Sequence, residues 1–350
     1  MRSNPSWPLQ PLRPQSRKLF IARGASGTCR WNLFKSIVCT SNPNNTLSQP
    51  LNSSHVDSHF TKERKRFHST LESAIATMYQ LPRLKSLSLN FWPNWHSERP
   101  SAIKDHRVVE FVARQKSLRA LYTSDPHPSL KSLVVTNLCL LYPRVDRHRS
   151  RRNIKATFLT QLQDLSISFL SDAEHAQVAE GDTRPVVPGP RDHLPPSHSH
   201  LRSLTLQSPR GLFHTHDLCP HSLFYPNLTT LSLENIVLGR PSSSGGMISF
   251  ILSHKSTLRK LELRSCPVII SDCATDSLRY WSQIWDRFAT ELSDLTDLTL
   301  THGHFGTGYK MFVEDKELET IILSPLRSQA DEAALENFRQ VVTERRAKIK

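Results

Sequence analysis

Residues 225–233 read YPNLTTLSL, and the spacing of the leucines in this stretch decides the fold. The leucines stand at positions 228, 231 and 233, which gives the pattern L-x-x-L-x-L. Side chains alternate between the two faces of a strand, so the second and third leucines point to the same side. The first leucine lies at the turn that leads into the strand. One such strand cannot bury its apolar face alone, which predicts that similar strands stack beside it.

The same pattern, with valine or isoleucine allowed in the last position, occurs seven times along the chain. The residues around it are also alike, as in LPRLKSLSL at 81–89 and KSTLRKLEL at 255–263. We therefore predict an α/β fold, an irregular leucine-rich-repeat solenoid with a parallel concave sheet and a helical convex side. The predicted strands contain the triplets Leu84-Leu87-Leu89, Leu130-Leu133-Val135, Leu162-Leu165-Ile167, Leu201-Leu204-Leu206, Leu228-Leu231-Leu233, Leu258-Leu261-Leu263 and Leu295-Leu298-Leu300.

Apolar residues at helical spacing lie between the triplets and predict helices on the convex side. A capping box, S-x-x-E at residues 69–72, predicts a helix to about residue 80, and apolar residues at 103–112 indicate a second helix. Met247, Phe250 and Ile251 indicate a third. The clearest stripe lies in residues 276–293, and we interpret it as core; its members are Leu278, Trp281, Trp285, Phe288 and Leu292.

The chain divides into three predicted parts. Residues 1–66 form a basic lead rich in proline and serine, with no acidic residue before Asp57, and we expect this lead to be disordered. Its prolines at 5, 8, 11 and 14 would break the amphipathic helix of a mitochondrial presequence, so none is expected. Residues 67–327 form the repeat region, with long loops at 143–156 and 171–200. Residues 328–350 form a helix and basic tail that cap the last repeat.

Composition and motifs disfavour an enzyme. The chain has 11 glycines against 23 prolines and contains no G-x-G-x-x-G, P-loop, G-x-S-x-G or H-E-x-x-H motif, so we predict no catalytic activity and no cofactor. Its six cysteines are scattered without a C-x-x-C pair, which is typical of a reducing compartment. No stretch approaches about 20 apolar residues. We therefore expect an intracellular protein of the cytoplasm or nucleus that does not enter a membrane.

Three longer phrases resemble the leucine-rich region of fungal F-box proteins. They are FILSHKSTLRKLELRSCPVI at 250–269, YWSQIWDRFATELSDLTDLTL at 280–300 and DEAALENFRQVVTERR at 331–346, and the resemblance covers roughly residues 67–346. It implies a substrate-recognition subunit of an SCF ubiquitin ligase, whose repeats hold the protein to be ubiquitinated. Residues 1–66 contain no F-box pattern, so the ligase adaptor is an expected partner only if an F-box lies upstream. The family usually has an Asn or Cys three residues after the last leucine of each repeat strand, and here only Cys266 stands at that position.

The residues that alternate with the strand leucines face the concave side and are the candidate partner-binding surface. Hydroxyl side chains dominate its early strands, while charges gather near the sixth. The alternative is a strand face that is merely solvated. The candidate residues for binding a protein are Ser166, Ser168, Thr205, Gln207, Ser232, Glu234, Lys260, Glu262, Arg264, Thr299 and Thr301.

Two other features offer alternative functions. Histidines crowd residues 193–221, but they lack the paired spacing of a closed zinc site, so we interpret them as part of a polar loop and predict no metal. Basic runs at 62–66, 144–155 and 345–350 could serve nucleic-acid binding, although aromatic residues are not interleaved with them. A stand-alone repeat scaffold without a ligase is the third alternative. The residues of the histidine group are His193, His198, His200, His214, His216, Cys219 and His221.

Overall fold

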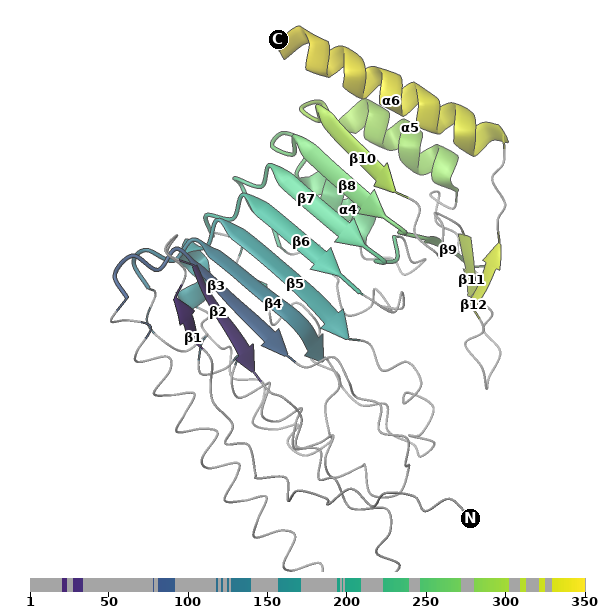
Figure 1. The fold of residues 1–350 in the computed structure, drawn as a ribbon. Helices are drawn as coiled ribbons and strands as arrows, with labels where there is room; N and C mark the ends of the chain where they lie inside the picture. The colour runs from purple at the N-terminus through teal and green to yellow at the C-terminus, as the bar shows by residue number, and fades with distance from the viewer. Residues whose placement is uncertain are drawn as a thin grey trace, which may run out of the picture.

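The structure is a computed structural model built around a nine-stranded sheet (Figure 1). It describes residues 21–23, 28–33, 78, 81–91, 118, 121, 125, 127–139, 157–170, 194–195, 197, 199–208, 223–238, 246–271, 280–301, 309–312, 321–324 and 329–349. The strands follow one another across the sheet in chain order. All are parallel to their neighbours except the first, which runs antiparallel to the second. The strands are β1 (Ile21–Arg23), β2 (Thr28–Leu33), β3 (Ser86–Phe91), β4 (Ser132–Cys139), β5 (Asp164–Leu170), β6 (Ser203–Gln207), β7 (Thr230–Glu234), β8 (Lys260–Arg264) and β10 (Asp297–Thr301).

The seven predicted strands all lie in this parallel sheet, as expected. Their central leucines are in register from strand to strand, so Leu231 of β7 lies between Leu204 of β6 and Leu261 of β8. These three side chains are completely buried. Along β3 and β6, successive residues alternate between partly exposed and buried positions. The period-two alternation of the sequence therefore separates an apolar face from a polar one.

The expectation of a disordered lead over residues 1–66 differs from the structure at two segments. β2 pairs in parallel with β3 and places Cys29 opposite Leu87 and Trp31 opposite Leu89. β1 then pairs with β2 and ends the sheet. The L-x-x-L-x-L search missed β2 because cysteine and tryptophan stand at the positions that leucine occupies in the other strands. The rest of the lead is outside the described residues.

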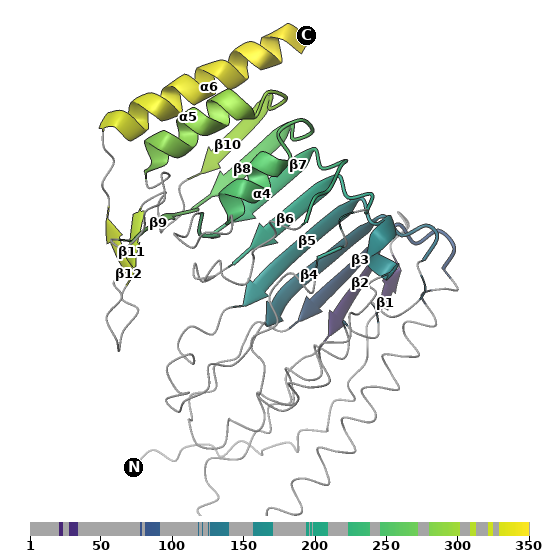
Figure 2. The ribbon, with the colours of Figure 1, turned by 180° about the vertical axis from the view of Figure 1, so that it is seen from behind.

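Helices cover the apolar face of the sheet (Figure 2). A 3-10 turn, Thr157–Gln161, leads into β5, and α4 (Met247–Ser253) and α5 (Trp281–Glu291) precede β8 and β10. Both α-helices were expected at these places from their apolar spacing, and five residues of each are buried. The predicted helices at 69–80 and 103–112 fall outside the described residues, apart from Met78, which is helical and buried.

The C-terminal helix α6 (Gln329–Ile349) lies along α5 on the side away from α4 and also contacts β10 (Figure 1). The sequence predicted this helix from about residue 328 to 346. Its Phe338 stacks on Trp285, with ring centroids 5.8 Å apart, and Trp285 stacks on Trp281 at 4.4 Å. This aromatic group continues the core beyond the last strand of the sheet. Among the described residues, no helix combines the length and apolarity that a membrane crossing requires.

A second, three-stranded sheet was not expected from the sequence. It consists of β9 (Val268–Ser271), β11 (Tyr309–Phe312) and β12 (Ile321–Ser324), in the order β12-β11-β9. β9 follows β8 directly and pairs in parallel with β11, which pairs antiparallel with β12. The loop predicted at 171–200 is described only at its end, where Leu194, Pro195 and Ser199 are buried.

Candidate functional site

The residue directly before each strand accepts two backbone hydrogen bonds from the start of the next strand. This repeated pattern fixes the register of the strands and so of the polar face. The carbonyl of Arg202 accepts the N–H groups of Thr229 and Thr230, and the carbonyl of Thr229 accepts those of Arg259 and Lys260, all at 2.9–3.0 Å. The same double acceptance recurs from β3 to β10. We call the residues at this position the strand-start row; they are Lys85, Lys131, Gln163, Arg202, Thr229, Arg259 and Thr296.

A second repeated feature follows three of the apolar triplets. Asn137, Asn235 and Ser265 have positive φ angles of 59°, 55° and 51°, and each stands two residues after the last apolar residue of a triplet. Asparagine tolerates this left-handed conformation better than most residues. The amide Nδ2 of Asn137 also donates to the carbonyl of Phe91 on the neighbouring strand at 2.8 Å. The sequence analysis missed these asparagines because it searched one position further along the chain.

Cys266 occupies the position at which the sequence analysis expected a bonding residue. Its side chain is buried, and its Sγ lies 3.3 Å from the carbonyl oxygen of Leu233 on the adjacent strand. Burial raises the pKa of the Cys266 thiol to about 12, so the sulfur keeps its proton and donates to carbonyl oxygens. Cys266 is therefore a structural group and a poor nucleophile.

The candidate binding residues do lie together on one face of the sheet, which we call the open face. They form rows across the strands, because the middle residue of each strand is in register with the middle residue of the next. Most are partly exposed; Ser168 and Ser232 are only 8% exposed, and Thr301 and Arg264 are exposed. The central row contains Ser166, Thr205, Ser232, Glu262 and Thr299, and the row nearer the strand ends contains Ser168, Gln207, Glu234, Arg264 and Thr301.

The charged residues of the open face form a connected group around Glu262. Its carboxylate lies 2.9 Å from Nζ of Lys260 and 3.6 Å from the guanidinium of Arg264. A hydrogen bond from Lys260, with a further one from Ser232, holds the pKa of Glu262 below its usual range. Glu234 is in register with Arg264 on the next strand. Opposite charges thus alternate along β8 and continue to Glu234 on β7, a pattern suited to a surface of polar and complementary charged groups.

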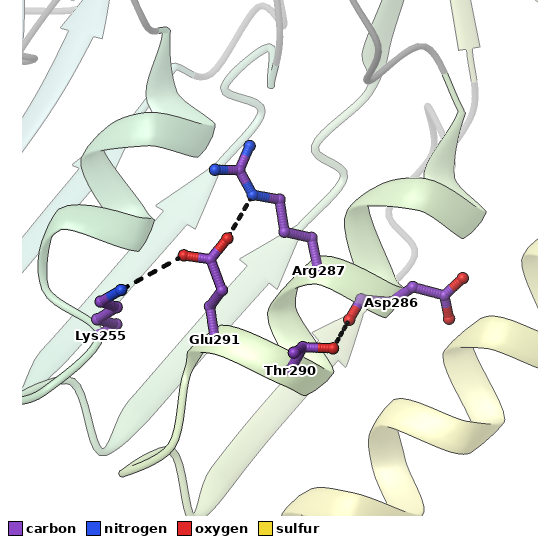
Figure 3. Close-up of polar contacts among 5 residues, drawn as sticks. All are labelled: Lys255, Asp286, Arg287, Thr290 and Glu291. Carbon is purple, nitrogen blue, oxygen red and sulfur yellow. Dashed lines mark hydrogen bonds and ion pairs between the residues drawn. The ribbon is translucent and has the colours of Figure 1, made fainter.

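A separate ion-pair group lies on the helical side (Figure 3). Glu291 of α5 accepts from Nε of Arg287 at 2.6 Å and lies 3.7 Å from Nζ of Lys255 in the turn after α4. Thr290 only donates to the backbone carbonyl of Asp286 within the same helix. These pairs are solvent-accessible and add little stability. Because they lie away from the open face, they provide a matched control for charge changes there.

The other sequence candidates are only partly described. No group of three metal-ligating side chains occurs within the described ranges. Of the histidine group, only His200 is described, and it is exposed. The basic runs at 62–66 and 144–155 lie outside the described residues. In the C-terminal run, Arg345 donates to the carbonyls of Leu292 and Ala289 at 2.7 and 2.6 Å, so it caps the end of α5 instead of presenting a free charge.

A buried histidine joins two neighbouring units behind the open face. Nε2 of His254 accepts the backbone N–H of Tyr225 at 2.9 Å, and Nδ1 donates to the carbonyl of Phe250 at 2.7 Å. Only the neutral ring can accept at Nε2 while it donates from Nδ1. The hydroxyl of Tyr225 reaches back to the carbonyl of Pro195 at 2.9 Å, so Tyr225 connects segments from three successive units.

We expect the stability of the protein to fall on acidification because of His254. Burial lowers the pKa of this histidine below its ordinary value of 6.5, so the unfolded chain takes up a proton more readily than the folded one. The stabilising contribution of the neutral ring is therefore present above about pH 6.5 and is lost as the pH falls through the folded pKa. Urea unfolding between neutral pH and pH 5 should show the fall. His254→Gln should flatten it, whereas His200→Gln, at an exposed site, should not; equal slopes would contradict the assignment.

Comparisons with known proteins identify no relative: no family model matches the chain, and neither the curated proteins nor the solved structures contain a match.

Proposed function

We propose that this chain is a leucine-rich-repeat solenoid, without enzymatic activity, whose open face binds a protein. The observation that carries the proposal is the register of the polar rows. Seven successive strands place residues of equivalent sequence position side by side, and the helices occupy the opposite face. Repeat proteins use such continuous surfaces to bind other macromolecules. An intracellular site of action, in the cytoplasm or nucleus, belongs to the same proposal.

The chemistry of the open face favours a protein partner over a small molecule. Its central row consists largely of hydroxyl groups, which can accept and donate hydrogen bonds, and its charged group around Glu262 contains both signs. Hydroxyls and alternating charges give orientation and specificity over an extended area. Buried thiol and imidazole groups, in Cys266 and His254, are engaged in structural hydrogen bonds, so they offer no reactive centre there.

The resemblance to fungal F-box proteins extends the proposal to a ligase. In that case the bound protein is a substrate for ubiquitination, and the adaptor attaches through an F-box encoded upstream of Met1. A free-standing scaffold with the same open face is the alternative. Capture of the purified SCF adaptor by the chain expressed with its in-frame upstream sequence distinguishes the two; failure of capture leaves the scaffold.

A charge-reversal pair tests the open face. Glu262→Lys combined with Arg264→Glu keeps the net charge but reverses the local pattern, and should weaken capture of a purified partner about tenfold, since two contacts of a few tenths to one kcal/mol each are lost. The measurement is quantitative affinity capture of one partner identified with the unaltered chain. The matched control is Arg287→Glu with Glu291→Lys on the helical side. Equal capture by both double variants would remove the open face as the binding surface.

A further inference from the structure

The strand-start row carries positive charge along one edge of the sheet. Four of its seven residues are basic and none is acidic. Lys85, Arg202 and Arg259 are exposed, and Lys131 is partly exposed. The row follows the edge at which the arrows of the parallel strands begin in Figure 1. Because these residues occupy equivalent backbone positions in register, their side chains leave the sheet at regular intervals.

These cations have no partner among the described residues. Within the part of the chain that the structure describes, the side chains of Lys85, Lys131, Arg202 and Arg259 form no hydrogen bond or ion pair, and Arg202 has only the longer-range attraction of Asp164. Arg264 on β8 behaves differently. It is paired with Glu262. The row is therefore a line of positive charge that flanks the open face and has no partner in the described part of the chain.

The spacing of the cations in the strand-start row matches the repeat distance of a peptide in polyproline II conformation. Lys131, Arg202 and Arg259 precede β4, β6 and β8, which are alternate strands of the sheet. Neighbouring strands lie about 4.8 Å apart, so successive cations are separated by about 9.6 Å. A polyproline II helix has three residues per turn and a rise of 3.1 Å, so residues on the same side recur about every 9.3 Å. An extended β peptide repeats its sides about every 6.8 Å and does not match.

We propose that the strand-start row binds an acidic peptide segment in polyproline II conformation, with a carboxylate at every third residue. This inference rests on the proposed function, since the segment belongs to the protein that the open face receives. Three carboxylates of such a segment would lie opposite Lys131, Arg202 and Arg259. Lys85, one strand before Lys131, adds a further cation at the end of the row. Proline between the acidic residues would preorganise the segment and lower the entropy cost of binding.

A peptide fits this edge better than a nucleic acid does. None of the seven residues of the row is aromatic, so bases have no stacking partner in it. Carboxylates also lie beside the row, at Asp164 and Asp297, each directly after a row residue. They would repel a continuous line of phosphates, whereas a peptide with widely spaced carboxylates can avoid them.

The test compares two labelled peptides of identical composition against the full chain by fluorescence anisotropy at low salt. One peptide repeats Glu-Pro-Pro four times; the other has its four glutamates adjacent, followed by the prolines. We expect the periodic peptide to bind about tenfold more tightly, because three pairs form only at the matching spacing. Lys131→Gln, Arg202→Gln and Arg259→Gln together should abolish this preference. The substituted side chains are outside the core, and a circular dichroism melt verifies that the variant folds.

A control variant removes the same charge elsewhere. Arg339→Gln, Arg346→Gln and Lys348→Gln lie on exposed positions of α6 and should leave binding of the periodic peptide unchanged. Equal binding of the two peptides, or an equal loss in the control, overturns the proposal. The proposal is also overturned if a twelve-nucleotide oligothymidine binds the row more tightly than the periodic peptide does, since the row would then be a nucleic-acid surface. If the periodic peptide does not bind but the open face still captures its partner, only the proposal for the strand-start row is overturned.

Discussion

Leu261→Ala should lower the free energy of unfolding by about 2–5 kcal/mol, the range for a large-to-small change in a packed core. Leu261 is completely buried and lies in register between Leu231 of β7 and Leu298 of β10. Its loss leaves a cavity in the middle of the stack, which neighbouring strands can fill only by breaking their shared register. Equilibrium urea unfolding, followed by circular dichroism, measures the change.

The adjacent residue provides the matched control, because it faces the opposite side of the same strand. Glu262 is partly exposed on the open face, and its ion pairs are accessible to solvent. Glu262→Gln should therefore change the free energy of unfolding by less than about 1 kcal/mol. Similar losses at positions 261 and 262 would show that the two faces of β8 are not divided into an apolar and a polar side, and would contradict the fold.

Arg345→Met should cost about 2–3 kcal/mol, although the residue lies in a run of surface charge at the end of the chain. Its guanidinium donates to the carbonyls of Leu292 and Ala289, which are among the last carbonyls of α5 and carry the negative end of the helix dipole. Methionine keeps much of the apolar stem but supplies no donor. Urea unfolding followed by tryptophan fluorescence measures the loss, because Trp281 and Trp285 lie on α5.

The N-terminal end of α5 is held by an acidic side chain of α6. Asp331 of α6 is buried and accepts the N–H of Ser282, in the first turn of α5, at 2.8 Å. An acid at the start of the helix and a base at its end both complement the dipole, so α6 secures α5 at two points. The control is Arg346→Met, at an exposed position one residue further along α6. An equal effect at 345 and 346 would contradict a specific role for Arg345.

Local sequence pattern predicted the elements whose signals repeat. Seven strands were found because each contains a leucine triplet, and α5 was found because its aromatic residues recur at helical spacing. β2 and the three-stranded sheet were missed because their strands lack such a repeated signal. In β2 the leucine positions hold Cys29 and Trp31, and β9, β11 and β12 are four residues long and lack a triplet. Short strands without a periodic signal are defined by their pairing partners.

The residues of the open face could be predicted from the sequence as a group, but the pairing of their charged side chains could not. Alternation places Glu262 and Arg264 on the polar side from sequence alone. Their pairing with each other and with Lys260 depends on side-chain geometry across one strand and on a hydroxyl from the next. The sequence analysis also considered the strand-start residues only as flanks of the triplets, although four of them are cations that remain unpaired within the described residues.

The sequence by itself determined which residues of each strand are apolar and which are polar, because strand periodicity follows from backbone geometry within a few residues. Only the tertiary structure decided which charges are available to a partner. The sequence does not distinguish Arg345 from Arg202, yet Arg345 caps α5 and Arg202 lies exposed at the edge of the sheet. The physical reason is that a charge is neutralised by groups within a few ångströms in space, and these groups come from segments far apart along the chain.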